Sequence, residues 1–126
     1  MPYEFFNPNP KYQRVGDCAV RAICKAIGTD WEDAYISLSA EGLVCKDMPS
    51  SNYVWGMLLK RYGYREHIIS SSCPDCVSVE EFSRSHKKGR YVLATQNHTV
   101  CLVDGTYFDS WDSGNEIVLY YYQKEE

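Results

Sequence analysis

The order of apolar and polar residues divides this chain into a helical first part and a strand-rich last part. In the first part, apolar residues recur every three or four positions, which is the period of a helix with one buried face. Capping residues precede these segments and glycines follow them, so the helix ends can be predicted as well. The pattern predicts helices over 17–26, 29–42, 52–62 and 78–88 and a strand over 64–69.

Specific residues set the expected ends of these helices. Gly28 stops the first helix, because glycine adopts the left-handed conformation that closes a helix. A capping box headed by Thr29 starts the second helix, and Gly42 ends it. Asn52 caps the third helix, and a second capping box headed by Ser78 opens the short fourth one.

Beyond residue 89 the chain becomes rich in β-branched and aromatic residues, with turn residues between the runs. Helices that come first and an antiparallel sheet that comes last indicate one α+β domain over residues 1–126. The segment 7–10, Asn-Pro-Asn-Pro, is predicted to be irregular because proline lacks a backbone N–H and disfavours helix in the residue before it. Strands are predicted over 90–95, 98–103, 106–109 and 116–122.

Length and charge limit the functions that this chain can have. Its 126 residues are enough for one core, and 17 acidic against 13 basic side chains make it mildly acidic. No run of Lys and Arg is strong enough to follow a phosphate backbone, so we expect no nucleic-acid partner. No stretch approaches the roughly 20 apolar residues that span a bilayer, and no signal peptide is recognisable. We therefore expect a cytoplasmic protein without a membrane partner.

The turn Asp104-Gly105 is a strong two-residue hairpin signal, and it sets the register of the strands that it joins. Val103 then pairs with Thr106, and counting outward places Asp109 on the same face as His98, one diagonal step away. Side chains can span the roughly 7–8 Å between α-carbons at such a step. The register predicts that the Asp109 carboxylate accepts the Nδ1 proton of His98 and so fixes the tautomer of the imidazole.

Cys18 stands where the first predicted helix begins. Gly16 and Asp17 close the loop before it, and good helix formers follow. The thiol is therefore expected at the positive end of the helix, where unpaired backbone N–H groups and the macrodipole favour an anion, and the thiolate is the nucleophilic form of cysteine. Together with His98 as the base and Asp109 as the group that orients it, Cys18 completes the constellation of a thiol enzyme.

Two short motifs, GDCAVRA at 16–22 and DSWDSG at 109–114, resemble the papain-like cysteine peptidase superfamily, and most closely its small phage and bacterial members. The resemblance implies a papain-like fold, in which Cys18 heads a helix that packs on an antiparallel sheet carrying His98 and an aspartate. It further implies that Gln13, five positions before the cysteine, donates to the oxyanion together with the backbone N–H of Cys18. Two features depart from the family pattern, since the domain is far smaller than papain and Ala19 replaces an aromatic residue after the cysteine.

From these residues and this resemblance we expect a cysteine hydrolase that cleaves an amide bond, as a peptidase or as an isopeptidase or amidase. Its substrate would be a peptide or protein, and the reaction needs no cofactor and no metal. Two alternatives remain open. One is a catalytically inactive papain-fold binding module of phage or bacterial origin, and the other is a zinc-stabilised interaction domain.

The zinc alternative depends on the segment 73–76, Cys-Pro-Asp-Cys, whose spacing suits a zinc chelate or a redox dithiol. A zinc site needs four ligands, so Cys45, His67 or His86 would have to complete it from a distance. The redox alternative is weaker, because such motifs usually follow a strand at the head of a longer helix. Most of the other cysteines are predicted to be free thiols.

Each candidate residue also has a purely structural interpretation. Cys18 is then a small buried residue at a helix start, and His98 is a hydrogen-bonded histidine of the sheet. Asp109 would accept from the backbone of the turn-rich segment that follows it, and Gln13 would be a solvated loop side chain. We favour the catalytic interpretation because Cys, His and Asp occur together in an order that suits it.

Overall fold

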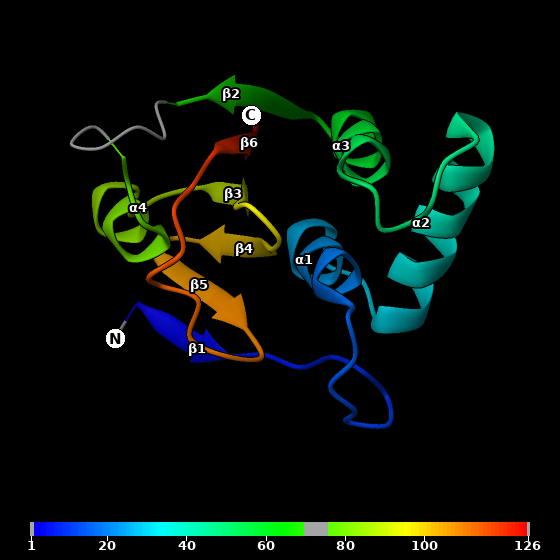
Figure 1. The fold of residues 1–126 in the computed structure, drawn as a ribbon, viewed down its shortest axis with the longest axis horizontal. Coiled ribbons are helices and arrows are strands. Elements are labelled where there is room, and N and C mark those ends of the chain that lie inside the picture. Colours follow the sequence, from blue (N-terminus) through cyan, green and yellow to red (C-terminus); the bar gives the residue numbers. More distant parts are fainter. Residues whose placement is uncertain (1, 70–75, 126) are drawn as a thin grey trace.

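The computed structural model describes residues 2–69 and 76–125 and contains helices on both sides of a mixed β-sheet (Figure 1). The helices are α1 (Cys18–Ile27), α2 (Trp31–Cys45), α3 (Asn52–Arg61) and α4 (Val79–Ser85). The strands are β1 (Tyr3–Phe5), β2 (Tyr64–Ile68), β3 (Arg90–Ala94), β4 (Thr99–Val103), β5 (Thr106–Asp109) and β6 (Tyr120–Lys124). The α+β class expected from the sequence is therefore observed.

The sheet has the strand order β1-β5-β4-β3-β6-β2. The strands from β3 to β6 and β2 pair antiparallel, as predicted, but β1 pairs parallel with β5. The expectation of a purely antiparallel, C-terminal sheet is thus wrong, because the N-terminal residues Tyr3–Phe5 add an edge strand beside Asp109. The backbone N–H of Phe6 still donates to Asp109 O at 2.7 Å, and only the proline-containing segment that follows is irregular.

The hairpin between β4 and β5 has the predicted register. Val103 pairs with Thr106, and both residues of the turn have positive φ, at +49° for Asp104 and +85° for Gly105. These are the angles that a type I′ turn requires, and the Asp104 carboxylate also accepts from the backbone N–H of Gly89 at 2.9 Å.

Several predicted ends differ from the structure. The N-cap of α2 is Asp30 rather than Thr29, because the Asp30 carboxylate accepts from the Asp33 N–H at 2.8 Å. The helix does not end at Gly42 but continues to a left-handed cap at Lys46. Ser51 caps α3 in place of Asn52, and the last strand is 120–124 rather than 116–122. By contrast, the end of α1 at Gly28 and the capping box of α4 are confirmed.

Apolar side chains cover both faces of the sheet because successive strand residues point to opposite sides. Val92, Ala94 and Cys101 face α1 and α3, where Trp55 is almost completely buried. Leu93, Val100 and Leu102 face the other way and pack with Phe82 of α4. As a result, α1 lies between the sheet on one side and α2 on the other (Figure 1). In the part of the chain that the structure describes, no helix is long and apolar enough to cross a bilayer.

Candidate active site

Cys18 is the first residue of α1, as the sequence predicts, and its side chain is partly exposed. The residue before it, Asp17, takes the N-cap position without making a side-chain cap hydrogen bond. The carboxylate of Asp17 is used elsewhere, so it does not occupy the backbone N–H groups of the first turn. The thiol therefore lies at a helix N-terminus whose donors and dipole favour a thiolate.

His98 lies in the turn directly before β4, with about 9 % of its side chain exposed, and faces both Cys18 and Asp109. Its Nε2 atom is 2.5 Å from Asp109 Oδ2. The predicted contact between these two residues is present, but the predicted use of Nδ1 is wrong. The hairpin register sets which side of the sheet His98 occupies, but the side-chain torsions of His98 decide which ring nitrogen meets the carboxylate, and here it is Nε2. Nδ1 is then the ring nitrogen left for the hydrogen bond with Cys18.

The pKa shifts of these side chains have a common cause. Burial disfavours the charged forms of both Cys18 and His98, but their mutual hydrogen bond and opposite charges outweigh it. The pKa of Cys18 is consequently lowered from its ordinary value, and the pKa of His98 is raised to about 9 by Asp109 and Cys18. The two shifts act in the same direction, toward a thiolate paired with an imidazolium.

Asp109 is completely buried and accepts hydrogen bonds on both carboxylate oxygens. Besides His98, its donors are Arg21 Nη2 at 3.0 Å, Ser113 Oγ at 2.6 Å and the backbone N–H of Ser110 at 2.8 Å. Burial would raise the pKa of Asp109, but the hydrogen bonds from His98 and Ser113 and the charges of His98 and Arg21 lower it. The carboxylate thus stays ionised, and it also accepts a hydrogen bond from the backbone of the turn that follows it.

Arg21 is a buried cation that the sequence analysis did not single out. It lies one helical turn after Cys18, and its Nη1 atom is 2.7 Å from Asp17 Oδ1. The other oxygen of Asp17 accepts from the Trp31 indole N–H at 2.9 Å. A chain of hydrogen bonds therefore runs from Trp31 on α2 through Asp17 and Arg21 to Asp109. In the sequence, the i, i+4 spacing of Asp17 and Arg21 is the signal that could have predicted the ion pair between these two residues.

Two further groups complete the surroundings of the thiol and the imidazole. The backbone N–H of Thr99 hydrogen-bonds Cys18 and contributes to its lowered pKa. The Trp111 ring lies 4.8 Å from the His98 ring, centroid to centroid, and covers one side of it. Continued outward, the hairpin register that pairs Val103 with Thr106 predicts Trp111 opposite His98, in agreement with this contact. The Thr99 contact depends on how α1 packs on the sheet and could not be predicted from local sequence patterns.

Gln13 is exposed in the loop that leads to Cys18. Its backbone carbonyl accepts from Asn7 Nδ2 at 3.4 Å, and no hydrogen bond joins its side chain to another residue that the structure describes. The structure therefore brings Cys18, His98 and Asp109 together. The expected oxyanion role of Gln13 stays a prediction.

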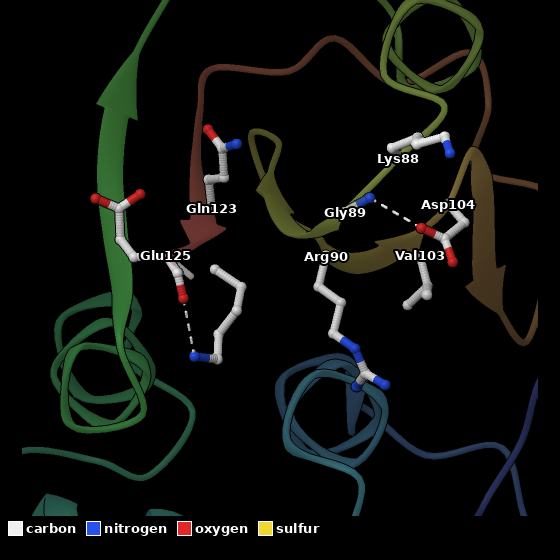
Figure 2. Close-up of a pocket in the computed structure, with 8 residues that line it drawn as sticks. Lys88, Gly89, Arg90, Val103, Asp104, Gln123 and Glu125 are labelled. Atoms are coloured by element: carbon white, nitrogen blue, oxygen red, sulfur yellow. Dashed lines mark hydrogen bonds between the residues drawn. The ribbon is translucent and has the colours of Figure 1, made fainter.

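A groove of about 300 Å³ opens between α1 and α2; Gly16, Asp17 and Ala19 line it, but Cys18 does not. A larger cavity, of about 640 Å³, lies where β3, β4 and β6 meet (Figure 2). There Arg90 reaches down to the last turn of α1, and its guanidinium donates to Lys25 O at 3.1 Å. Cys18 begins this helix and Lys25 lies seven residues later, so about 10 Å of helix separates the cysteine from the Arg90 contact. Neither the groove nor the larger cavity is lined by Cys18, His98 or Asp109.

The cysteine pair of the zinc alternative lies only partly within the described residues, since Cys73 falls outside them. Cys76 is disulfide-bonded, whereas Cys18, Cys24, Cys45 and Cys101 are free thiols, as predicted for most of the cysteines. Across residues 2–69 and 76–125 there is no group of three or more His, Cys, Asp or Glu side chains that could hold a metal ion.

Comparison with protein-family models, with curated proteins and with solved structures finds no match to this chain. Function must therefore be inferred from the residues of this chain and their geometry.

Proposed function

We propose that this protein is a cysteine hydrolase of the papain-like superfamily that cleaves an amide bond in a peptide or protein. The observation that carries the proposal is the contact of His98 with two partners, the Asp109 carboxylate at 2.5 Å and the thiol at the start of α1. A nucleophile, a base and a group that orients the base are the three parts that such chemistry needs. The raised pKa of His98 and the lowered pKa of Cys18 support the same assignment.

In the proposed reaction, the Cys18 thiolate attacks the carbonyl carbon, and the carbonyl electron pair moves to oxygen. The C–N bond then breaks, and the His98 imidazolium gives its proton to the departing amine. Neutral His98 next takes a proton from water, whose oxygen attacks the acyl carbon. The C–S bond breaks, and the carboxylic product leaves behind the thiolate and the imidazolium.

The developing oxyanion needs donors that point at it. The backbone N–H of Cys18 is one candidate, because it belongs to the first turn of α1 and has no partner within the helix. Gln13, which is exposed in the loop before α1, is the second. Removal of one such donor typically costs about 3–4 kcal/mol of transition-state stabilisation.

A binding module without turnover is the second candidate function. It draws support from the outer face of α2, where Ile36, Leu43 and Val44 are 63 %, 70 % and 67 % exposed. Large apolar side chains that stay exposed on one helix are the kind of surface that can bind another protein.

Alkylation by iodoacetamide at pH 6 separates the two candidates. An enzyme thiolate reacts at this pH, whereas an ordinary thiol is almost fully protonated. We expect labelling of Cys18 in the native chain, no labelling at this position in Cys18→Ala, and a rate at least about tenfold lower in His98→Ala. Cys45→Ala is the matched control, because this free thiol lies away from the site and has a raised pKa.

Hydrolysis itself is tested with an acyl electrophile and with a library of peptide amides, using the same variants. Turnover that is lost in Cys18→Ala and His98→Ala supports the hydrolase. Equal reactivity of Cys18 in the native chain and in His98→Ala would overturn the proposal and leave the binding module as the better assignment.

A further inference from the structure

The outer face of α2 is apolar, although no element that the structure describes covers it. Through its inner face α2 packs against α1 and α3, and in Figure 1 it forms the margin of the molecule. The buried residue Leu38 points inward, whereas the apolar side chains of Ile36, Leu43 and Val44 stay exposed on the other side. A helix on the surface of a globular protein normally has a polar outer face, so this pattern is that of a helix covered on both sides.

The exposed apolar residues form one stripe along the helix, which we call the outer stripe. Its members are spaced i, i+4, i+7 and i+8, the spacing of residues that share one face of a helix: Ile36, Ala40, Leu43 and Val44. Rows of side chains with this spacing are the surfaces that two helices present to each other when they pack side by side. The outer stripe therefore suits a second helix.

Opposite charges lie at the two ends of the outer stripe. Glu32 is exposed in the first turn of α2, and Lys46 is exposed at its C-cap, 14 residues later. Within the described part of the chain, neither side chain forms an ion pair. The Asp47 carboxylate beside Lys46 already accepts from the Met48 N–H at 2.7 Å and from the Ser51 hydroxyl at 2.9 Å. Glu32 and Lys46 are thus available to a partner that carries the opposite charges.

We propose that α2 pairs antiparallel with α2 of a second copy of this chain, so that the protein forms a symmetric dimer. The midpoint between Glu32 and Lys46 is Ser39, and a two-fold axis there places Glu32 opposite Lys46 of the second copy. The midpoint between Ile36 and Leu43 lies within half a residue of the same point, so these two side chains also meet across the axis. Each contact then occurs twice, as a two-fold axis requires. A parallel pair instead places like charges side by side.

The surroundings of the outer stripe provide room for the second copy. A hollow of about 560 Å³ lies between α2 and α3, with Val44, Leu58 and Tyr62 in its lining. On the other flank of the stripe, Leu43 lines a hollow of about 410 Å³ near the C-terminal end of α2. Helices pack by seating the ridge of one in the groove of the other, and the small side chain of Ser39 near the axis allows a close approach. Stripe and hollows are therefore complementary between two copies.

Dimerisation through α2 leaves the candidate active site open and does not depend on the proposed function. The Cys18 thiol meets His98 and Thr99 on the side of α1 that packs against the sheet. The outer stripe lies on the side of α2 that points away from α1 (Figure 1). Both copies in the dimer therefore keep an accessible thiol.

Sedimentation velocity of the full chain tests the dimer directly. We expect the native chain to sediment as a dimer at about 100 μM and to dissociate on dilution. Leu43→Asp places a charge in the middle of the outer stripe and should raise the dimer Kd about 100-fold or more. Ile68→Asp is the matched control, because Ile68 is 82 % exposed on the edge strand β2 and should leave the Kd unchanged.

Charge reversal tests the antiparallel direction. Glu32→Lys and Lys46→Glu each place like charges opposite one another at both ends of the interface, so each should raise the Kd about tenfold or more. The double variant brings opposite charges together again, and its Kd should return to within about threefold of the native value.

Cross-linking locates the axis independently of affinity. A mixture of Ile36→Cys and Leu43→Cys chains should form a disulfide between positions 36 and 43 under mild oxidation, identified by mass spectrometry of the linked peptides. Each of the two variants alone should not link position 36 to 36 or 43 to 43, because about 10 Å of helix separates these positions in the antiparallel pair.

Three outcomes decide against the inference. A native chain that stays monomeric at about 100 μM overturns the dimer and leaves the outer stripe to a different protein. A dimer that Leu43→Asp does not weaken, or one that links position 36 to 36, overturns the antiparallel pairing through α2. Alkylation of Cys18 at pH 6 should be equal in Leu43→Asp and the native chain, so loss of the dimer leaves the hydrolase proposal standing.

Discussion

Arg21 Nη2 lies 3.0 Å from Asp109 Oδ1, and both side chains are buried. The same guanidinium also contacts Asp17, the residue directly before the nucleophile, at 2.7 Å. One cation therefore joins the loop that presents Cys18 to the carboxylate that holds His98. Because guanidinium is planar and offers several donors in fixed directions, it can bridge two carboxylates in a way that a lysine ammonium cannot reproduce.

Replacement of Arg21 by glutamine leaves two buried carboxylates without their cation. Loss of one partner of a buried ion pair typically costs about 3–5 kcal/mol, so we expect the free energy of unfolding to fall by about that amount in Arg21→Gln. The charge of Arg21 also lowers the pKa values of Cys18 and Asp109. Alkylation of Cys18 at pH 6 should accordingly slow in this variant.

Arg84→Gln is the control for this prediction. Arg84 and Glu80 also form an i, i+4 pair, at 2.6 Å, but their side chains are 65 % and 40 % exposed. Exposed pairs of this type contribute only about 0.3–0.5 kcal/mol. Urea denaturation gives the loss of unfolding free energy in each variant. It thereby compares an i, i+4 ion pair in the protein interior with one on the surface. Equal losses in the two would contradict the structural role assigned to Arg21.

Ser113→Ala tests the second support of Asp109. The buried Ser113 hydroxyl donates to Asp109 Oδ2 at 2.6 Å, and hydrogen bonds to charged groups contribute about 1.5–3 kcal/mol. We expect the free energy of unfolding of Ser113→Ala to fall by about 1.5–3 kcal/mol. We also expect the pKa of Asp109, followed by NMR titration, to be higher in this variant than in the native chain. Ser110→Ala is the matched control, since residue 110 donates through its backbone N–H, which alanine keeps. If Ser110→Ala destabilises as much as Ser113→Ala, the hydroxyl is not the relevant donor.

The pH dependence follows from the raised pKa of His98. A group whose pKa is higher in the folded state stabilises that state fully below its unfolded pKa, which is about 6.5 for histidine, and loses this contribution as pH rises through the folded value of about 9. The difference in unfolding free energy between the native chain and His98→Gln should therefore shrink between pH 6.5 and pH 9. The same titration followed by NMR should give a His98 midpoint near 9, and a midpoint near 6.5 would refute the ion pair.

Much of the site could be predicted from the sequence because it depends on local signals. The helix start at Cys18 follows from a loop closed by glycine and aspartate. The proximity of His98 and Asp109 follows from the Asp104-Gly105 turn, which sets the register of β4 and β5. Both signals act over a few residues, so one sequence is sufficient to detect them.

The missed features depend on contacts between distant segments. β1 has only three residues, and it becomes a strand because β5 offers an unpaired edge. Arg21 is an unremarkable helix-forming residue in the sequence, and its role emerges only when α1 packs so that Asp17 and Asp109 face it together. The ring orientation of His98 likewise depends on its side-chain torsions and on its contacts with Asp109 and Cys18, which the strand pattern does not fix.

The prediction that Gly42 ends α2 is wrong, and this glycine is needed for another reason. The sequence suggested that this glycine ends α2, but the helix continues past it. A Cβ atom at this position would lie 2.7 Å from the backbone oxygen of Asp47, so glycine is required because the loop after the helix passes close to it.

We expect Gly42→Ala to lower the free energy of unfolding by about 1–3 kcal/mol despite the higher helix propensity of alanine. Gly16→Ala is the control, because a Cβ atom there meets nothing within 4 Å. Urea denaturation measures both variants, and a Gly42→Ala variant as stable as the native chain would show that the loop can move aside.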